Sequence, residues 1–148
     1  MVQISRILSP AVLVYAWGLA AASGAAPLGS VVAVEASLAA SNEVPPNSSM
    51  GTGLLDASFN RETNVLNYTI TYSGLSGPVK AGHFHGPASA GTNACVSLPF
   101  VDGMDSPIKG TAILNAAQVA DLLAGKWYVN LHTASNPGGE IRGQVHVK

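Results

Sequence analysis

The C-terminal stretch "KWYVNLHTASNPGGEIRGQVHVK", residues 126–148, decides the fold class of this chain. Tyr128, Asn130 and His132 alternate with the apolar Val129 and Leu131. Alternation with a period of two is typical of a strand that buries one face. Residues 139–148 repeat the pattern, and the "ASNPGG" segment between the two runs indicates a tight reversal. The stretch therefore predicts two neighbouring antiparallel strands.

The remainder of the chain after the first thirty residues predicts the same architecture. Short segments of strand-forming residues recur at intervals of about ten, broken by turn residues, as in an antiparallel β domain. One helix interrupts them, because residues 114–126 combine an apolar stripe with Asn115 and Gln118 spaced as a capping box and with Gly125 as a stop. We therefore expect an all-β, antiparallel, Greek-key-like β-sandwich with one short helix. The expected strands cover 31–40, 52–60, 63–74, 77–88, 95–103 and 108–114, besides the two C-terminal ones.

The N-terminal segment predicts where the protein is sent rather than how it folds. Arg6 is followed by an uncharged apolar run that ends in small residues, "AASGAAP" at 21–27, and no charge returns until Glu35. This order predicts a signal peptide over 1–26, a single domain over 27–148 and a secreted or periplasmic protein. A retained membrane anchor is the alternative, since about twenty residues can span a bilayer. Pro10 and the Gly- and Ala-rich second half favour cleavage, so contact with a membrane is expected only through an uncleaved signal segment.

Charge and cysteine content limit the partners and the means of stabilisation. The formal net charge is −1, and the lysines and arginines are scattered singly, so a nucleic acid partner is not expected. Cys95 is the only cysteine, which rules out an internal disulfide. We interpret Cys95 as a small buried apolar residue rather than a reactive thiol or a ligand.

The histidines are the one group of residues in this sequence that suggests a chemical function. Two of the four lie in "AGHFHGPASAG", residues 81–91, where His83 and His85 share a face of the predicted strand. His132 lies on the polar face of the strand predicted above. If the strands are neighbours, three imidazoles could share one ion, and nitrogen ligation without thiolate suits copper(II) or zinc. In the alternative interpretation the rings only donate hydrogen bonds to backbone carbonyls or to Glu140.

The polar run "GEIRGQ" at 139–144 and the last strand supply possible supporting residues. Glu140 and Arg142 either pair with each other as a structural unit or orient the metal ligands, with the arginine steering an anion. Asn130 shares the face of His132, and His146 is a possible outlying member. We find no GxSxG elbow, no HExxH pair and no phosphate-binding loop, so no catalytic residue is predicted.

Three motifs, "EVPP" at 43–46, "HFHGPA" at 83–88 and "YVNLHTASNPGGEIRGQ" at 128–144, resemble the CHRD domain, first defined in chordin. The resemblance covers about residues 31–147 and implies an all-β domain in an exported protein. Growth-factor sequestration is not implied, because the other modules of chordin are missing from this sequence. The positions that match recurring family residues are His83, His85, Gly86, Pro87, Asn130, His132, Thr133, Gly139, Glu140, Arg142 and Gly143.

These observations lead to three hypotheses of different kinds. The first is an exported binding module that holds copper or zinc through His83, His85 and His132, with an unidentified extracellular protein or the metal ion itself as partner. The second is a structural or adhesive extracellular domain without metal. The third, from a looser similarity to the copper and zinc superoxide dismutases, is a copper-dependent redox protein. This sequence lacks the long zinc-bearing loop and the disulfide cysteines of those dismutases, so an enzyme is not our leading interpretation.

Overall fold

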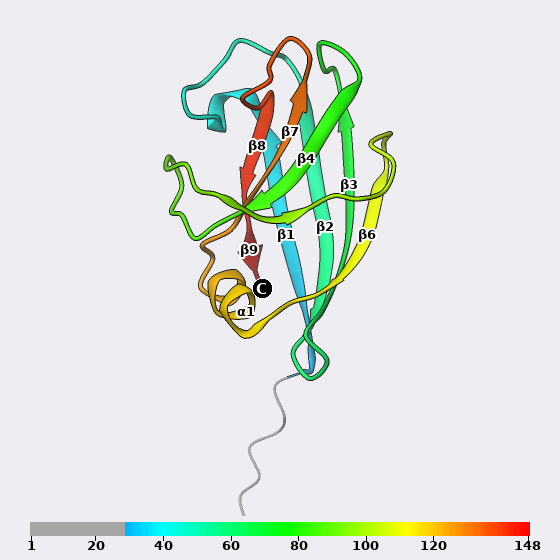
Figure 1. Cartoon of the computed structure of the whole chain (residues 1–148), viewed down its shortest axis with the longest axis vertical. Coiled ribbons are helices and arrows are strands. Elements are labelled where there is room, and N and C mark those ends of the chain that lie inside the picture. Colours follow the sequence, from blue (N-terminus) through cyan, green and yellow to red (C-terminus); the bar gives the residue numbers. More distant parts are fainter. Residues whose placement is uncertain (1–28) are drawn as a thin grey trace, which may run out of the picture.

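The computed structural model of this chain describes residues 29–148, and within them the regular secondary structure is mostly β-strand (Figure 1). The first three strands have nine residues each, and all the later ones are shorter. A single turn of 3-10 helix, η1 (Ala40–Asn42), follows the first strand, and α1 (Ala116–Leu123) is the one α-helix of the described residues. The strands are β1 (Val31–Ala39), β2 (Thr52–Asn60), β3 (Val65–Ser73), β4 (Val79–His85), β5 (Val96–Pro99), β6 (Ile108–Ile113), β7 (Tyr128–Thr133), β8 (Ile141–Gln144) and β9 (His146–Val147).

All of these strands belong to one antiparallel sheet with the order β5-β4-β7-β8-β1-β2-β3-β6, while β9 pairs with β1. The sheet curls so strongly that its two halves face each other, and in Figure 1 β4, β7 and β8 lie across β1, β2 and β3. Contact between Tyr68 of β3 and Phe84 of β4, with ring centroids 5.4 Å apart, confirms that the halves pack together. The two halves join where β8 and β9 meet β1, at Ala39 opposite Arg142 and at Val34 opposite Val147.

The core fixes which side chains of β4 and β7 point outward. Phe84 is fully buried and packs edge-on against Phe100, with ring centroids 5.3 Å apart. Because neighbouring residues of a strand point to opposite faces, burying Phe84 sends His83 and His85 to the outer face. On β7 the same rule applies, since Val129 and Leu131 are fully buried. The outer face of the β4–β7 pair therefore carries polar side chains.

The short helix follows the local signals in the sequence. Asn115 accepts a hydrogen bond from the amide of Gln118, and the Gln118 side chain accepts from the amide of Asn115, which completes the capping box. Gly125 ends the helix with a φ of +67°, a conformation that favours glycine. The helix buries Leu122 in the core and hydrogen-bonds β5 through Gln118, so it closes one end of the curled sheet.

The expected all-β antiparallel fold with one short helix is confirmed, and its two packed layers are the two halves of one continuous sheet. The expectation for Cys95 is wrong. The residue is exposed, because it lies at the end of the 86–95 loop beside an edge strand, where its carbonyl accepts from Gly86 and its side chain meets no core. The predicted signal peptide and its boundary with the domain lie outside the described residues. Within residues 29–148, no helix has the length and apolarity needed to cross a membrane.

Candidate metal site

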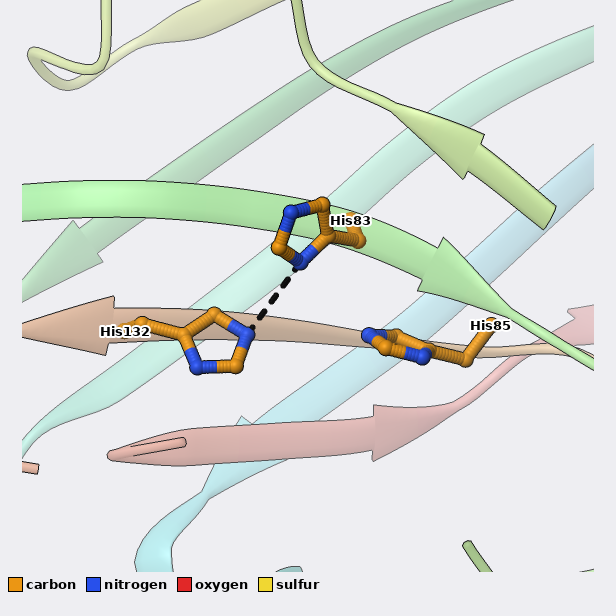
Figure 2. Close-up of side chains that lie close together, drawn as sticks. All are labelled: His83, His85 and His132. Atoms are coloured by element: carbon orange, nitrogen blue, oxygen red, sulfur yellow. Dashed lines mark hydrogen bonds between the residues drawn. The ribbon is translucent and has the colours of Figure 1, made fainter. Parts of the chain in front are cut away.

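Strand pairing brings the three predicted histidines together. His83 and His85 come from β4 and His132 from β7, and the two strands are neighbours with Ala81 opposite His132 and His83 opposite Asn130. Figure 2 shows the three rings on one side of these strands, with His83 and His132 joined by a hydrogen bond and one nitrogen of His85 facing them. One ring nitrogen from each histidine can be chosen so that all three lie within 4.8 Å of one another. This spacing suits three ligands of a single ion, and the prediction that the rings converge is confirmed.

The carbonyl partners of two rings determine which nitrogens are free. His85 Nδ1 lies 3.0 Å from the carbonyl of Ala94, and His132 Nδ1 lies 2.9 Å from the carbonyl of Pro137. A carbonyl only accepts, so both Nδ1 atoms carry hydrogen and donate. In the neutral rings, Nε2 of His85 and Nε2 of His132 are therefore left with lone pairs. Such a backbone bond on the distal nitrogen is what orients a histidine that ligates metal through its other nitrogen.

Acceptor atoms outnumber the hydrogens available between the rings. His132 Nε2 lies 3.2 Å from His83 Nδ1 and 3.0 Å from Asn130 Oδ1. With neutral imidazoles and the amide oriented as in the structure, His83 Nδ1 is the only atom of these three that can carry a hydrogen. His85 Nε2 adds a buried nitrogen with no hydrogen-bond partner at all. Buried lone pairs without donors are costly, and a cation at their centre would satisfy them together.

Burial also keeps two of the rings in the form that binds metal. Desolvation lowers the pKa of His83 below its usual 6.5, and the neighbouring His132 and His85 lower it further. Desolvation likewise lowers the pKa of His85, although its bond to Ala94 opposes the shift. Metal coordination requires the neutral ring, so these shifts favour ligation near neutral pH.

A stack of three side chains supports His85 from one side. The Tyr128 ring lies parallel to the imidazole of His85 with centroids 4.8 Å apart, and the guanidinium of Arg142 lies 3.4 Å from the centroid of Tyr128. Since β4 and β8 flank β7 on opposite sides, the imidazole and the guanidinium cover opposite faces of the phenol ring. The Tyr128 ring restrains the His85 ring on one face. On its other face, cation–π attraction helps to stabilise the buried guanidinium of Arg142.

The 86–95 loop holds both ends of the same stack, Arg142 and His85, by hydrogen bonds. Arg142 donates from Nη1 to Asn93 Oδ1 at 2.9 Å and from Nη2 to the carbonyl of Thr92. Asn93 in turn donates to the carbonyl of Val44, and the next residue, Ala94, accepts from His85. Arg142 is only 2 % exposed, so its guanidinium is committed to these contacts and does not stand at the mouth of the site to steer an anion.

The expected pairing of Glu140 with Arg142 or with the imidazoles is wrong. Glu140 precedes β8, beside Gly139 with its φ of +131°, so the alternation of the strand does not apply to it. Its carboxylate instead turns to the core side and accepts from Ser49, Ser76 and Thr133. Burial raises the pKa of Glu140, but these hydrogen bonds outweigh it and hold the pKa at about 2. Glu140 therefore has a structural role and does not contact the histidines.

Of the two other residues predicted to lie near the histidines, one does and one does not. Asn130 touches His132 directly, as described above. His146 is exposed on β9, opposite Glu35 of β1, and does not belong to the imidazole group. Of the four histidines, three converge and one is remote.

Sequence reasoning missed Glu43, a buried carboxyl on the loop after η1. Burial raises its pKa to about 7, while Arg142, the amide of Val44 and the side chain of Asn130 pull it down in part. Its carboxyl packs so closely against Gly139 that a Cβ atom there would collide with Oε1. The only signal in the sequence was its position in the "EVPP" motif, because a loop residue has no periodicity to reveal its direction.

These features define a class of protein: a curled antiparallel β domain with a cluster of three imidazoles on its outer face. The family model for the CHRD domain matches residues 34–145, which is most of the chain. The chain belongs to the CHRD family. None of the curated proteins and none of the solved structures compared with it matches.

Proposed function

We propose that this protein is an exported binding module that holds one copper or zinc ion through His83, His85 and His132. The observation that carries the proposal is the convergence of one ring nitrogen from each histidine within 4.8 Å. Thiolate is absent from the group, and nitrogen donors of this kind suit copper(II) and zinc. His85 and His132 would ligate through Nε2, because their Nδ1 atoms donate to backbone carbonyls.

The surroundings support a site that is shaped before the ion arrives. Backbone carbonyls, the Tyr128 ring and the 86–95 loop restrain the imidazoles, as outer partners do around metal-binding histidines. His83 and His132 are partly exposed, so an ion can enter from solvent. Export, which the N-terminal sequence predicts, would expose the site to extracellular or periplasmic metal. The natural partner would then be that metal or an extracellular protein.

Metal analysis of the protein made without a tag tests the proposal. Protein from copper- and zinc-replete medium is expected to contain about one ion per chain. His83→Ala and His132→Ala should lose it, whereas His146→Ala, which changes a histidine outside the cluster, should retain it. Absence of bound metal in the unsubstituted protein would refute the site. If the same substitutions lower thermal stability equally with and without metal, the imidazoles serve only as an internal hydrogen-bond network.

A further inference from the structure

A fourth donor atom, the amide oxygen of Asn130, lies beside the three imidazoles. Asn130 is directly opposite His83 in the pairing of β4 with β7, and it precedes His132 by two residues on β7. All three side chains therefore leave the sheet on its outer face. Asn130 is only 3 % exposed, and its Oδ1 lies 3.0 Å from His132 Nε2. In the neutral ring this contact joins two lone pairs with no hydrogen between them, and a shared cation would remove their repulsion.

The neighbours of the Asn130 amide favour the orientation in which its oxygen faces the rings. Burial raises the pKa of Glu43 to about 7, and among the groups that pull it down in part is the side chain of Asn130, as an N–H donor beside a carboxylate does. Turning the amide over would place its oxygen against that carboxylate, which is repulsive. The NH₂ group therefore belongs on the side of Glu43, and Oδ1 belongs on the side of the imidazoles.

The spacing of the donor atoms matches the ligands of one ion. Zinc binds histidine nitrogen and amide or carboxylate oxygen at about 2.0 to 2.2 Å, so two ligands at the tetrahedral angle lie about 3.3 Å apart. His132 Nε2 lies 3.2 Å from His83 Nδ1, the two nitrogens joined in Figure 2, and 3.0 Å from Asn130 Oδ1. With the nitrogen of His85, the group supplies three nitrogens and one oxygen, which is a complete set for a four-coordinate ion.

We propose that Asn130 Oδ1 is the fourth ligand of the ion, so that the protein encloses it in a closed four-coordinate site with no position for a substrate or an external anion. This inference rests on the proposed three-histidine site and extends it. Structural sites fill all four positions with protein ligands, whereas catalytic sites keep one open. The ion is then held for structure or storage and is not a catalytic centre. Glu43 is a positioning residue, because it keeps the amide oxygen turned toward the ion.

Cobalt(II) tests the proposal, since it replaces zinc and its visible spectrum reports its coordination. The cobalt-loaded protein should show the intense bands of a four-coordinate ion, and added azide should leave them unchanged. Asn130→Ala admits water as the fourth ligand. This variant should bind cobalt at least about tenfold more weakly, and azide should now shift its bands by displacing the water. Asn67→Ala is the matched control, because Asn67 is exposed on β3 and should leave both the bands and the azide response unchanged.

The outcomes separate this inference from the metal site itself. An unsubstituted protein that takes up no metal would refute the three-histidine site and the fourth ligand together. A protein that binds cobalt but whose bands shift with azide has an open position, which would overturn the role of Asn130 and leave the histidine site standing. Azide-insensitive bands in Asn130→Ala would also overturn it. Asn130→Ser, whose hydroxyl is too short to reach the ion, serves in place of the alanine variant if that protein does not fold, with the same expected azide response.

Discussion

Two polar clusters lie on opposite faces of β7, one residue apart in the sequence, and they use their hydrogen bonds differently. On the core side, the carboxylate of Glu140 receives hydrogen bonds from Ser49, Ser76 and Thr133. On the outer side, His132 meets His83 and Asn130, and the nearby Nε2 of His85 has no partner. The first cluster is complete within the chain, while the second is short of a positive partner. Full satisfaction indicates a structural network, and shared lone pairs without donors indicate a site for a ligand.

Removing the satisfied carboxylate should produce the largest loss of stability. In Glu140→Gln the amide NH₂ would face hydroxyl and amide donors in a buried place, so the free energy of unfolding should fall by about 3 to 5 kcal/mol. Urea denaturation of the metal-free protein measures this loss. Glu35→Gln is the matched control, since within residues 29–148 Glu35 forms an ion pair only with Lys148, at the surface. This substitution should change stability by less than about 0.5 kcal/mol. A loss below about 1 kcal/mol for Glu140→Gln would mean that the Glu140 network is not a main structural support, contrary to the comparison with the histidine cluster.

The same carboxylate should make stability depend on acid pH. Its pKa is about 2 in the folded protein against an ordinary value of 4.5, so below pH 4.5 the unfolded chain binds the proton first. The stabilisation is therefore complete above about pH 5 and disappears as the pH falls toward 2, by about 3 kcal/mol in total. Unfolding free energies measured from pH 6 to about pH 2 should show this slope, and Glu140→Gln should lack it. An equal slope in both proteins would assign the acid sensitivity to other groups.

The sequence predicts the histidine cluster but not the carboxylate network, and the reason is geometric. Period-two alternation is reliable inside a strand, so it assigns His83 and His85 to one face of their strand and His132 to the polar face of another. Glu140 lies before β8, next to a glycine with positive φ, and there alternation gives no direction. Glu43 and Asn93 lie on loops, where contacts depend on the tertiary path of the chain. Pairing of β4 with β7, strands separated by more than forty residues, likewise depends on that path and not on any local pattern.

Metal addition should stabilise the protein through the outer cluster alone. At a concentration of copper(II) or zinc about a hundred times the dissociation constant, the free energy of unfolding should rise by about 2.7 kcal/mol. His85→Ala should abolish this rise, and His146→Ala should keep it. Because burial lowers the pKa of His83 and His85 below 6.5, the rise should persist at pH 6.5, where an ordinary imidazole is half protonated, and decline at lower pH. Thermal melts with and without metal measure it, and a rise that survives His85→Ala would assign the metal to another site.

The smallest expected effect tests whether the 86–95 loop positions the ligands rather than merely covering them. Asn93→Ala removes the acceptor of Arg142 Nη1 and the donor to Val44, but both partners lie near solvent or keep another contact, so stability should fall by only about 1 kcal/mol. Metal affinity should nevertheless fall by about tenfold, because the loop carries the Ala94 carbonyl that holds His85. Thr92→Ala is the matched control: Thr92 contacts Arg142 through its backbone carbonyl, so loss of its side chain should leave affinity unchanged. Competition titrations against a chelator of known affinity compare the two variants. Equal affinities would mean that the stack of Tyr128 on His85 orients the ring without help from the loop.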